Sequence, residues 1–108
     1  MESIPIQIVT YMAISKFHTI LIFFEYLAKN LRYPVKAQEN GIQGNVYVTF
    51  YVERDGSLSD IHITGSVDPS LDKEAVRMIE GTKSWIPGKV DGKVVRTEYT
   101  KVLRFRLR

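Results

Sequence analysis

The sequence predicts an α+β fold, in which a three-stranded antiparallel sheet has two helices packed on one of its faces. Two stretches, residues 45–53 and 95–107, alternate apolar and polar residues as strands do. Two others, residues 15–31 and 71–79, repeat apolar residues at helical spacing. A shorter strand-like stretch near residues 58–63 completes the order helix, strand, strand, helix, strand.

Length and composition fit a single globular domain. The chain has 108 residues, of which 44% are hydrophobic and 25% are charged, as is usual for folded proteins. It contains no cysteine, which excludes disulfides, thiolate metal sites and thiol nucleophiles. We expect residues 1–14 to form an arm, either a short strand or irregular, and residues 15–108 to form the domain.

The first helix is predicted over residues 15–31, because apolar side chains recur along one helical face. These residues are Ile20, Phe24, Leu27 and Leu31. Pro34 pushes the residue before it out of helical geometry and ends the helix. A short helical turn is expected between Pro34 and Gly41.

The first strand is predicted over residues 45–53. Its buried face carries Val46, Val48, Phe50 and Val52. Asp55-Gly56 then supplies the positive φ that a tight hairpin turn needs. In the second strand Ile61 and Ile63 share the buried face, while Leu58 is out of phase with them. We therefore expect a bulge or an irregular start at Leu58.

The second helix begins at Asp68, which can cap it with Pro69 in the first helical position. Ser70 is the alternative cap, and Gly81 is placed to stop the helix. Its apolar stripe consists of Leu71, Ala75, Met78 and Ile79. Trp85 is expected on the core, and Pro87-Gly88 is expected to form a turn.

A second Asp-Gly pair, Asp91-Gly92, leads into a long last strand. One face of this strand carries Val95, Thr97, Tyr99, Leu103, Phe105 and Leu107, and the other carries Arg96, Glu98, Thr100, Arg104 and Arg106. Lys101 falls on the apolar face and interrupts it. The net charge is +3, and basic residues concentrate from Lys93 to Arg108. Such an end suits an acidic partner, a nucleic acid or a solvated strand face.

Membrane and export signals are weak in this sequence. The uninterrupted apolar run from Ile20 to Phe24 is far shorter than the roughly 20 residues that span a bilayer. Glu2 is unlike the basic start of a signal peptide. The chain as written is therefore expected neither to span a membrane nor clearly to export itself.

No residue pattern predicts catalysis. His18 and His62 lie far apart without a metal-ligand motif, and His62 is interpreted as a solvent-facing neighbour of Asp60. The carboxylates have structural interpretations as a turn residue, a cap and first-turn helix acids. They are Asp55, Asp68, Asp72 and Glu74. We expect no enzyme activity, no metal and no cofactor.

The last strand is the best candidate for a binding surface. At a sheet edge it would offer unpaired backbone groups, to which an extended peptide can add as a further strand. The same edge could pair with a second copy of the chain. A weaker alternative is single-stranded nucleic acid stacked on Tyr47 and Tyr51 of the first strand.

A series of short motifs resembles the C-terminal domain of TonB, the periplasmic energy transducer of Gram-negative bacteria. In order they are Tyr33-Pro34, Ala37, Gly41, Gly44, Phe50, Val52, Asp55-Gly56, Leu71-Asp72, Ala75, Trp85, Pro87-Gly88, Gly92 and Phe105-x-Leu107. The resemblance covers residues 27–108, about three quarters of the chain. The lead-in EYLAKNLRYP is similar to the form of the domain found in Bacteroidetes.

The resemblance implies a periplasmic binding module rather than a catalyst. Its partner would be the TonB box, a short extended segment of outer-membrane receptors that import iron chelates, cobalamin or glycans. Carried over by position, the receptor strand would lie beside the last strand and be held by the segment before Tyr33-Pro34. The implied partner-binding residues are Asn30, Leu31, Arg32, Tyr33, Val94, Val95, Arg96, Thr97, Glu98, Tyr99, Thr100, Lys101, Val102, Arg104 and Arg106.

The sequence departs from this family's pattern in three places. It carries no transmembrane anchor and no Pro-rich spacer. We therefore expect either part of a longer transducer or an orphan domain that self-associates or serves as an adaptor beside a sensor protein. The stretch from Ile14 to Phe24 lacks the usual Pro-Gly-rich entry to the first helix. Lys101-Val102 stands where many relatives have an apolar residue and a proline.

Overall fold

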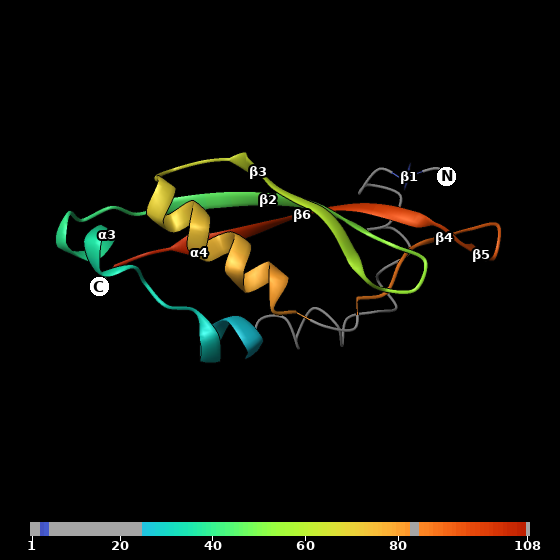
Figure 1. The fold of residues 1–108 in the computed structure, drawn as a ribbon, viewed down its shortest axis with the longest axis horizontal. Helices are drawn as coiled ribbons and strands as arrows, with labels where there is room; N and C mark the ends of the chain where they lie inside the picture. The colour runs from blue at the N-terminus through green and yellow to red at the C-terminus, as the bar shows by residue number, and fades with distance from the viewer. Residues whose placement is uncertain (1–2, 5–24, 83–84, 108) are drawn as a thin grey trace.

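The computed structural model of the chain describes residues 3–4, 25–82 and 85–107 (Figure 1). Its strands are β1 (Ser3–Ile4), β2 (Gly44–Val52), β3 (Leu58–Gly65), β4 (Lys89–Val90), β5 (Lys93–Val94) and β6 (Arg96–Phe105). Its helices include α3 (Val35–Glu39) and α4 (Pro69–Glu80). β2 pairs antiparallel with both β3 and β6, which confirms the predicted three-stranded antiparallel sheet. β1 adds a short parallel strand on the far side of β6, in the order β1-β6-β2-β3.

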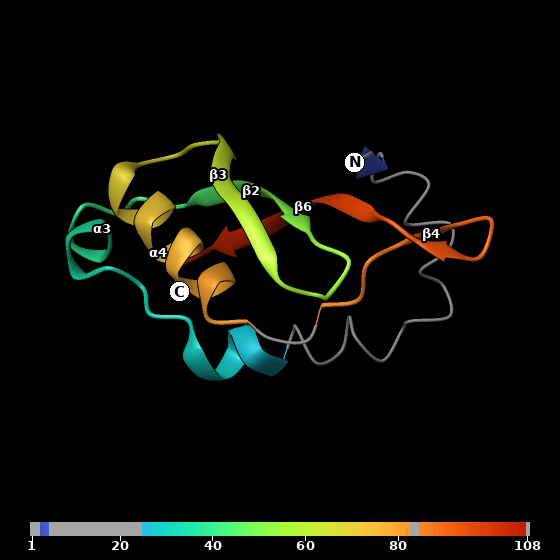
Figure 2. The same ribbon diagram turned by 45° about the vertical axis from the view of Figure 1, so that its right-hand side comes forward.

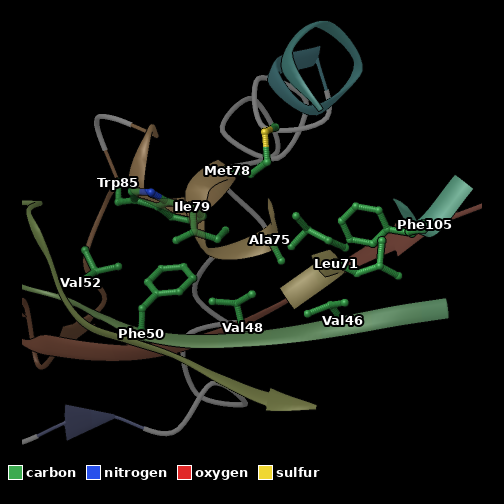
Figure 3. Close-up of a cluster of buried hydrophobic side chains, with 12 residues drawn as sticks. Val46, Val48, Phe50, Val52, Leu71, Ala75, Met78, Ile79, Trp85 and Phe105 are labelled. Carbon is green, nitrogen blue, oxygen red and sulfur yellow. The ribbon is translucent and has the colours of Figure 1, made fainter. Parts of the chain in front are cut away.

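The core lies between one face of the sheet and α4 (Figure 3). The four predicted apolar residues of β2 are fully buried there, because every second side chain of a strand points to the same face. The predicted stripe of α4 is buried against them. Trp85 joins the same cluster, with its ring centroid 5.0 Å from that of Phe50 in an edge-on arrangement. The predicted core of these elements is therefore confirmed.

Both ends of α4 follow the predicted signals. The Asp68 side chain caps the helix by accepting hydrogen bonds from the Ser70 backbone N at 3.0 Å and from the Ser70 hydroxyl at 2.6 Å, and Pro69 is the first helical residue. Gly81 ends the helix at an ordinary φ of −81°. The reason for a glycine is space, because a Cβ there would lie 2.4 Å from the Tyr26 hydroxyl.

The first helix is described only at its end. Residues 25–30 are helical, as predicted. Leu27 and Leu31 pack against the core, on the same side of the sheet as α4. The other predicted residues of this stripe, Ile20 and Phe24, lie outside the described residues. Within the described ranges, no helix is long and apolar enough to cross a membrane.

The two Asp-Gly pairs make different turns. In the β2–β3 loop Gly56 has a φ of 87° while Asp55 does not enter the left-handed region. The Glu53 backbone N donates to the Ser57 carbonyl at 2.7 Å, so the turn has three residues, with glycine at the left-handed position. At Asp91 and Gly92 φ is 51° and 78°, which suits a two-residue turn between β4 and β5.

Three local expectations were wrong. Asp91-Gly92 does not lead directly into the last strand, because β4 and β5 pair with each other as a separate hairpin. Pro87-Gly88 is not a turn: the Gly88 backbone N donates to Thr97 Oγ1 at 2.7 Å and its carbonyl accepts from the Val95 backbone N at 3.0 Å. The irregularity of β3 lies at Asp60 rather than at Leu58, which pairs with Val52.

Candidate peptide-binding edge

β6 is regular along its inner side. It pairs with β2 without interruption from Phe105 opposite Gly44 to Thr97 opposite Val52. On its outer side, Ser3 and Ile4 of β1 pair with Arg96 and Thr97, and Figures 1 and 2 place β1 beside the start of β6. In the part of the chain that the structure describes, the stretch from Glu98 to Phe105 has no strand on that side. We call this stretch the β6 edge.

The other edge of the sheet, β3, is irregular. Its pairing with β2 shifts register twice, between Tyr47 and Val48 and between Thr49 and Tyr51 of β2. At the second shift Asp60 takes a φ of 51°, in the left-handed region. Bulges of this kind bend a strand and interrupt its row of unpaired backbone groups, so they discourage pairing with another chain. Of the two edges, the β6 edge is the better template for strand addition.

The side of β6 turned away from α4 carries an alternating row of side chains, which we call the outer row. It consists of Glu98, Thr100, Val102 and Arg104. The Thr100 hydroxyl shares a hydrogen bond of 2.8 Å with the Thr49 hydroxyl. Val102 and its cross-strand neighbour Tyr47 are each 40% exposed. The row is therefore acidic, polar, apolar and basic in turn along the strand.

Arg96 lies just before this row and is held by its neighbours. Its Nε is 3.0 Å from the Glu53 carboxylate, and its guanidinium lies 3.6 Å above the Tyr51 ring. Hydrogen bonds from Ser59 and Arg96 hold the pKa of Glu53 below its usual value. Because Arg96 covers one face of Tyr51, that face is closed to the base stacking considered from the sequence.

The opposite row of β6 faces the core. Tyr99, Lys101 and Leu103 stand opposite the buried residues of β2, so Lys101 does interrupt the apolar face as predicted. Its ammonium lies 5.7 Å from the centre of the Trp85 ring, and burial lowers the pKa of Lys101. Burial likewise raises the pKa of Tyr99, whose hydroxyl donates to the Ile86 carbonyl at 3.3 Å.

The segment from Asn30 to Tyr33 reaches β6 only at its end. The Tyr33 ring packs edge-on against Phe105, with 5.7 Å between centroids. Earlier in the segment, Arg77 Nη2 donates to the Asn30 carbonyl at 3.1 Å, and the Arg32 backbone N donates to Glu74 at 2.7 Å. The structure therefore packs Tyr33 against the buried, core-facing side chain of the last residue of β6 and fastens the preceding residues to α4.

Glu74 and Arg77 are important residues that the sequence interpretation missed. The sequence predicts a first-turn helix acid at Glu74, but this residue is only 8% exposed and accepts two hydrogen bonds of 2.7 Å from Arg77. Burial alone would raise the pKa of Glu74, yet the bonds from Arg77 and the Arg32 N–H outweigh it and the pKa is lowered. The sequence did contain a signal for this burial, because Glu74 lies three residues after Leu71 and therefore on the buried stripe of the helix.

Some predicted site residues fall outside the β6 edge. Val94 belongs to β5 and pairs with Lys89, Val95 precedes β6, and Arg106 follows it. The hairpin of β4 and β5 projects beyond the sheet where β6 begins (Figure 2). Among the described residues, no three His, Cys, Asp or Glu side chains gather as metal ligands.

Comparisons with known proteins agree on one family. A family model described as Gram-negative bacterial TonB protein C-terminal matches residues 29–107. Protein TonB of Pseudomonas aeruginosa is 33% identical over 75 residues, which is 69% of this chain and 22% of that protein. The chain thus spans about a fifth of the length of this curated relative.

Two solved structures share the fold. A solution structure of the TonB C-terminal domain of Helicobacter pylori covers all of both chains with a TM-score of 0.62 at 21% identity. A solution structure of a shorter piece of the same domain has a TM-score of 0.55 at 29% identity, over 79% of this chain and 90% of that one.

Proposed function

The chain belongs to the Gram-negative bacterial TonB protein C-terminal family, and from that premise we propose that it binds the TonB box of outer-membrane receptors by strand addition. The receptor segment lies along the β6 edge as a further strand of the sheet. The family acts in TonB-type energy transduction and is periplasmic in general. We accordingly place this domain in the periplasm, where it supports active uptake of iron chelates, cobalamin or glycans.

The β6 edge is the observation that carries this proposal. Within the described residues, the backbone from Glu98 to Phe105 faces outward without a neighbouring strand. An added strand gains affinity mainly from backbone hydrogen bonds, which need no catalytic side chain. The short parallel ladder from β1 supports the choice of edge, because the chain's own backbone already pairs with β6 at Arg96 and Thr97.

The hydrogen bonds of Glu74 and Arg77 support the same site from the side of the sheet that α4 covers. They hold the segment from Asn30 to Arg32 on α4, and Tyr33 then packs against Phe105 at the end of the β6 edge. A module that transmits force must keep its binding strand fixed to its core. We infer that this network gives β6 a rigid support rather than contacting the receptor segment itself.

An NMR titration of the labelled domain with N-methylated peptides tests strand addition. In one TonB-box peptide every second backbone amide is methylated. In another peptide of the same sequence the remaining amides are methylated instead. Only one set of amides in an added strand faces β6, so one methylated peptide is expected to bind like the parent and the other to lose binding. Shifts are expected at Tyr33 and from Glu98 to Phe105. Equal binding by both methylated peptides, or shifts confined to β3, would contradict the proposal.

Self-association is a second candidate for the same edge. The pairing of β1 with β6 favours it, because the same two-residue ladder could form between the arm of one copy and the β6 of another. Sedimentation equilibrium over a wide concentration range separates the two functions. A mass that rises with concentration and falls when peptide is added is expected for a shared edge, whereas a constant monomer mass removes this candidate.

A further inference from the structure

The β4–β5 hairpin gathers apolar side chains at the surface. Ile86, just before it, and Val90 and Val94 within it are 40%, 41% and 38% exposed. Single apolar residues scattered over a surface are normal, but a group of them often marks contact with another protein or with a membrane. The hairpin is therefore a candidate contact surface.

Nothing in the described part of the chain covers the hairpin. β4 and β5 form a separate two-stranded sheet, and all four of their residues are exposed. The hairpin projects beyond the start of β6, at the opposite end of the molecule from α3 (Figures 1 and 2). A two-stranded hairpin without a packed face is only marginally stable in water. Burial of its valines against a partner would therefore stabilise the hairpin itself.

Each face of the hairpin carries one valine and one lysine. Lys89 stands opposite Val94, and Val90 stands opposite Lys93. Residues opposite each other in a sheet point to the same face, whereas successive residues point to opposite faces. A lysine can lay its aliphatic stem along an apolar surface while its ammonium reaches a polar layer. Both faces thus match a boundary at which an apolar layer meets anionic groups.

Basic residues outnumber acidic ones on the hairpin and the neighbouring β2–β3 turn. A Cβ at Gly56 would lie 2.8 Å from the Trp85 carbonyl oxygen, so this turn lies beside the segment that leads into the hairpin. Arg54 in the turn is exposed, like the two lysines of the hairpin, and the exposed acids are Asp55 and Asp91. The excess of positive charge favours an anionic surface.

The small size of the hairpin favours a bilayer over a protein as its partner. Stable protein–protein interfaces take about 20–30 residues from each side, whereas the two strands and their turn comprise only residues 89–94. Attraction of basic residues to an anionic lipid surface, by contrast, adds up residue by residue. Because both faces carry the same two residue types, neither face is marked for a partner of fixed shape.

We propose that the β4–β5 hairpin binds the surface of a bilayer that contains anionic phospholipid. Its valines and Ile86 enter the boundary between headgroups and acyl chains, while Lys89 and Lys93 reach the phosphate groups. This inference goes beyond the proposed function and does not rest on it. A domain held in this way keeps its sheet clear of the lipid, because the hairpin projects beyond the sheet (Figure 2).

Vesicle co-sedimentation of the complete chain tests this inference. At low salt, binding is expected to vesicles of equal parts phosphatidylcholine and phosphatidylglycerol, with little binding to phosphatidylcholine alone. The double variant Lys89→Gln/Lys93→Gln is expected to bind the anionic vesicles more weakly, by about fivefold for each lysine removed. Lys36→Gln/Lys73→Gln makes the same change in net charge at exposed positions of α3 and α4. It is the matched control and is expected to bind like the wild type.

Two single variants separate charge from apolar contact. Asp91→Asn removes a negative charge from the hairpin and is expected to tighten binding by up to about fivefold. Asparagine tolerates the left-handed φ of 51° at this position, and misfolding would not explain a gain. Val90→Ser is expected to weaken binding several-fold, because less apolar surface is buried. Val67→Ser, at a side chain of similar exposure, 39%, is its control and should have little effect.

Other outcomes would overturn the proposal. Equal weakening by the hairpin and the control lysine variants would mean that net charge alone causes binding. Binding to soluble polyglutamate as tight as to the anionic vesicles, or indifference to Val90→Ser, would mean that the partner is an acidic molecule other than a lipid surface. Absence of vesicle binding by a folded chain would also overturn it. A chain that binds vesicles but no TonB-box peptide would support this role of the hairpin and remove only the proposed function.

Discussion

At the scale of single residues, Glu74 connects α4 to the segment that leads out of the first helix. It accepts hydrogen bonds from the Arg77 side chain and from the Arg32 backbone N, each at 2.7 Å. The three hydrogen bonds that this carboxylate accepts offset the free-energy cost of burying it. The same carboxylate leaves unsatisfied donors behind if it is removed.

Glu74→Ala is therefore expected to lower the free energy of unfolding by about 2–3 kcal/mol, because the Arg32 N–H loses its acceptor. Urea denaturation followed by circular dichroism measures this. Glu80→Ala, at an exposed position of the same helix, is the control and should change the stability little. A similar loss for both variants would mean that a general effect of removing a carboxylate from the helix, rather than this network, is responsible.

The network should also be visible in the dependence of stability on pH. The pKa of Glu74 is lower in the folded chain than its ordinary value. Such a carboxyl stabilises the fold above its unfolded pKa of about 4.3, and the contribution is lost as the pH falls through the folded value. Stability is thus expected to fall below about pH 4.3, with Glu53 and Asp68 acting in the same direction.

Glu74→Gln isolates the part due to Glu74, since glutamine cannot be protonated in this range. The difference in unfolding free energy between wild type and Glu74→Gln should shrink as the pH is lowered from neutral. Urea midpoints at a series of pH values provide the measurement. Parallel curves for the two proteins would show that Glu74 does not contribute.

Gly81 offers a second test at this scale. Its φ of −81° suits any residue, so an exchange to alanine would ordinarily be harmless. Here the new Cβ would lie 2.4 Å from the Tyr26 hydroxyl, which donates to the Met78 carbonyl at 3.0 Å. Gly81→Ala is therefore expected to destabilise by about 1–2 kcal/mol. Tyr26→Phe should remove most of this penalty in a double-mutant cycle, and additive effects would contradict the stated contact.

At the scale of elements, the sequence was informative where a pattern was local and long. The alternation of Val46, Val48, Phe50 and Val52 predicted β2, and Asp68 with Pro69 predicted the start of α4. The β4–β5 hairpin was missed because two-residue strands carry no periodic signal. The bond between Gly88 and Thr97 was missed because a side chain replaces a backbone partner there. Neither omission changes the residues that were predicted to form the core.

The candidate site was predictable in part, because the last strand also carries a long local pattern. The length of the last strand and the order of the elements indicated an edge, and the register confirms that the predicted rows face opposite sides of the sheet. The pairing of β1 with β6 joins residues more than ninety positions apart, and two residues such as Ser3 and Ile4 carry no pattern that predicts it. The contact of Glu74 with Arg32 is likewise long-range, and only its helical partner Arg77 could be seen in the sequence.

The β1 element makes a prediction about peptide length. Because Ser3 and Ile4 occupy the outer side of Arg96 and Thr97, a peptide that reaches these positions must displace them. Removing residues 1–4 is expected to tighten binding of such a long peptide several-fold, in proportion to the fraction of chains in which β1 is paired. A peptide that spans only Glu98–Phe105 should bind unchanged. Isothermal calorimetry on both proteins measures this, and equal effects on the two peptides would contradict it.

At the scale of the whole molecule, the described residues form a sheet with one covered face and two unlike edges. Helix α4 and the segment around Leu27 and Leu31 lie on the covered face. β6 is regular, whereas β3 is bulged at Asp60. These properties depend on different residues, so the face supplies stability while the edges decide what can pair with the sheet.

The bulges of β3 have a consequence for stoichiometry. A sheet with two regular edges can grow from both sides, and repeated addition leads toward fibrils. The domain itself therefore presents one regular edge to a peptide, at β6, because the opposite edge, β3, is interrupted. We expect mass spectrometry of the native complex to find one peptide per domain even at high peptide excess. Deleting Asp60 removes the residue at one of the two register shifts of β3, so this variant is expected to bind a second peptide at high excess, at its other edge.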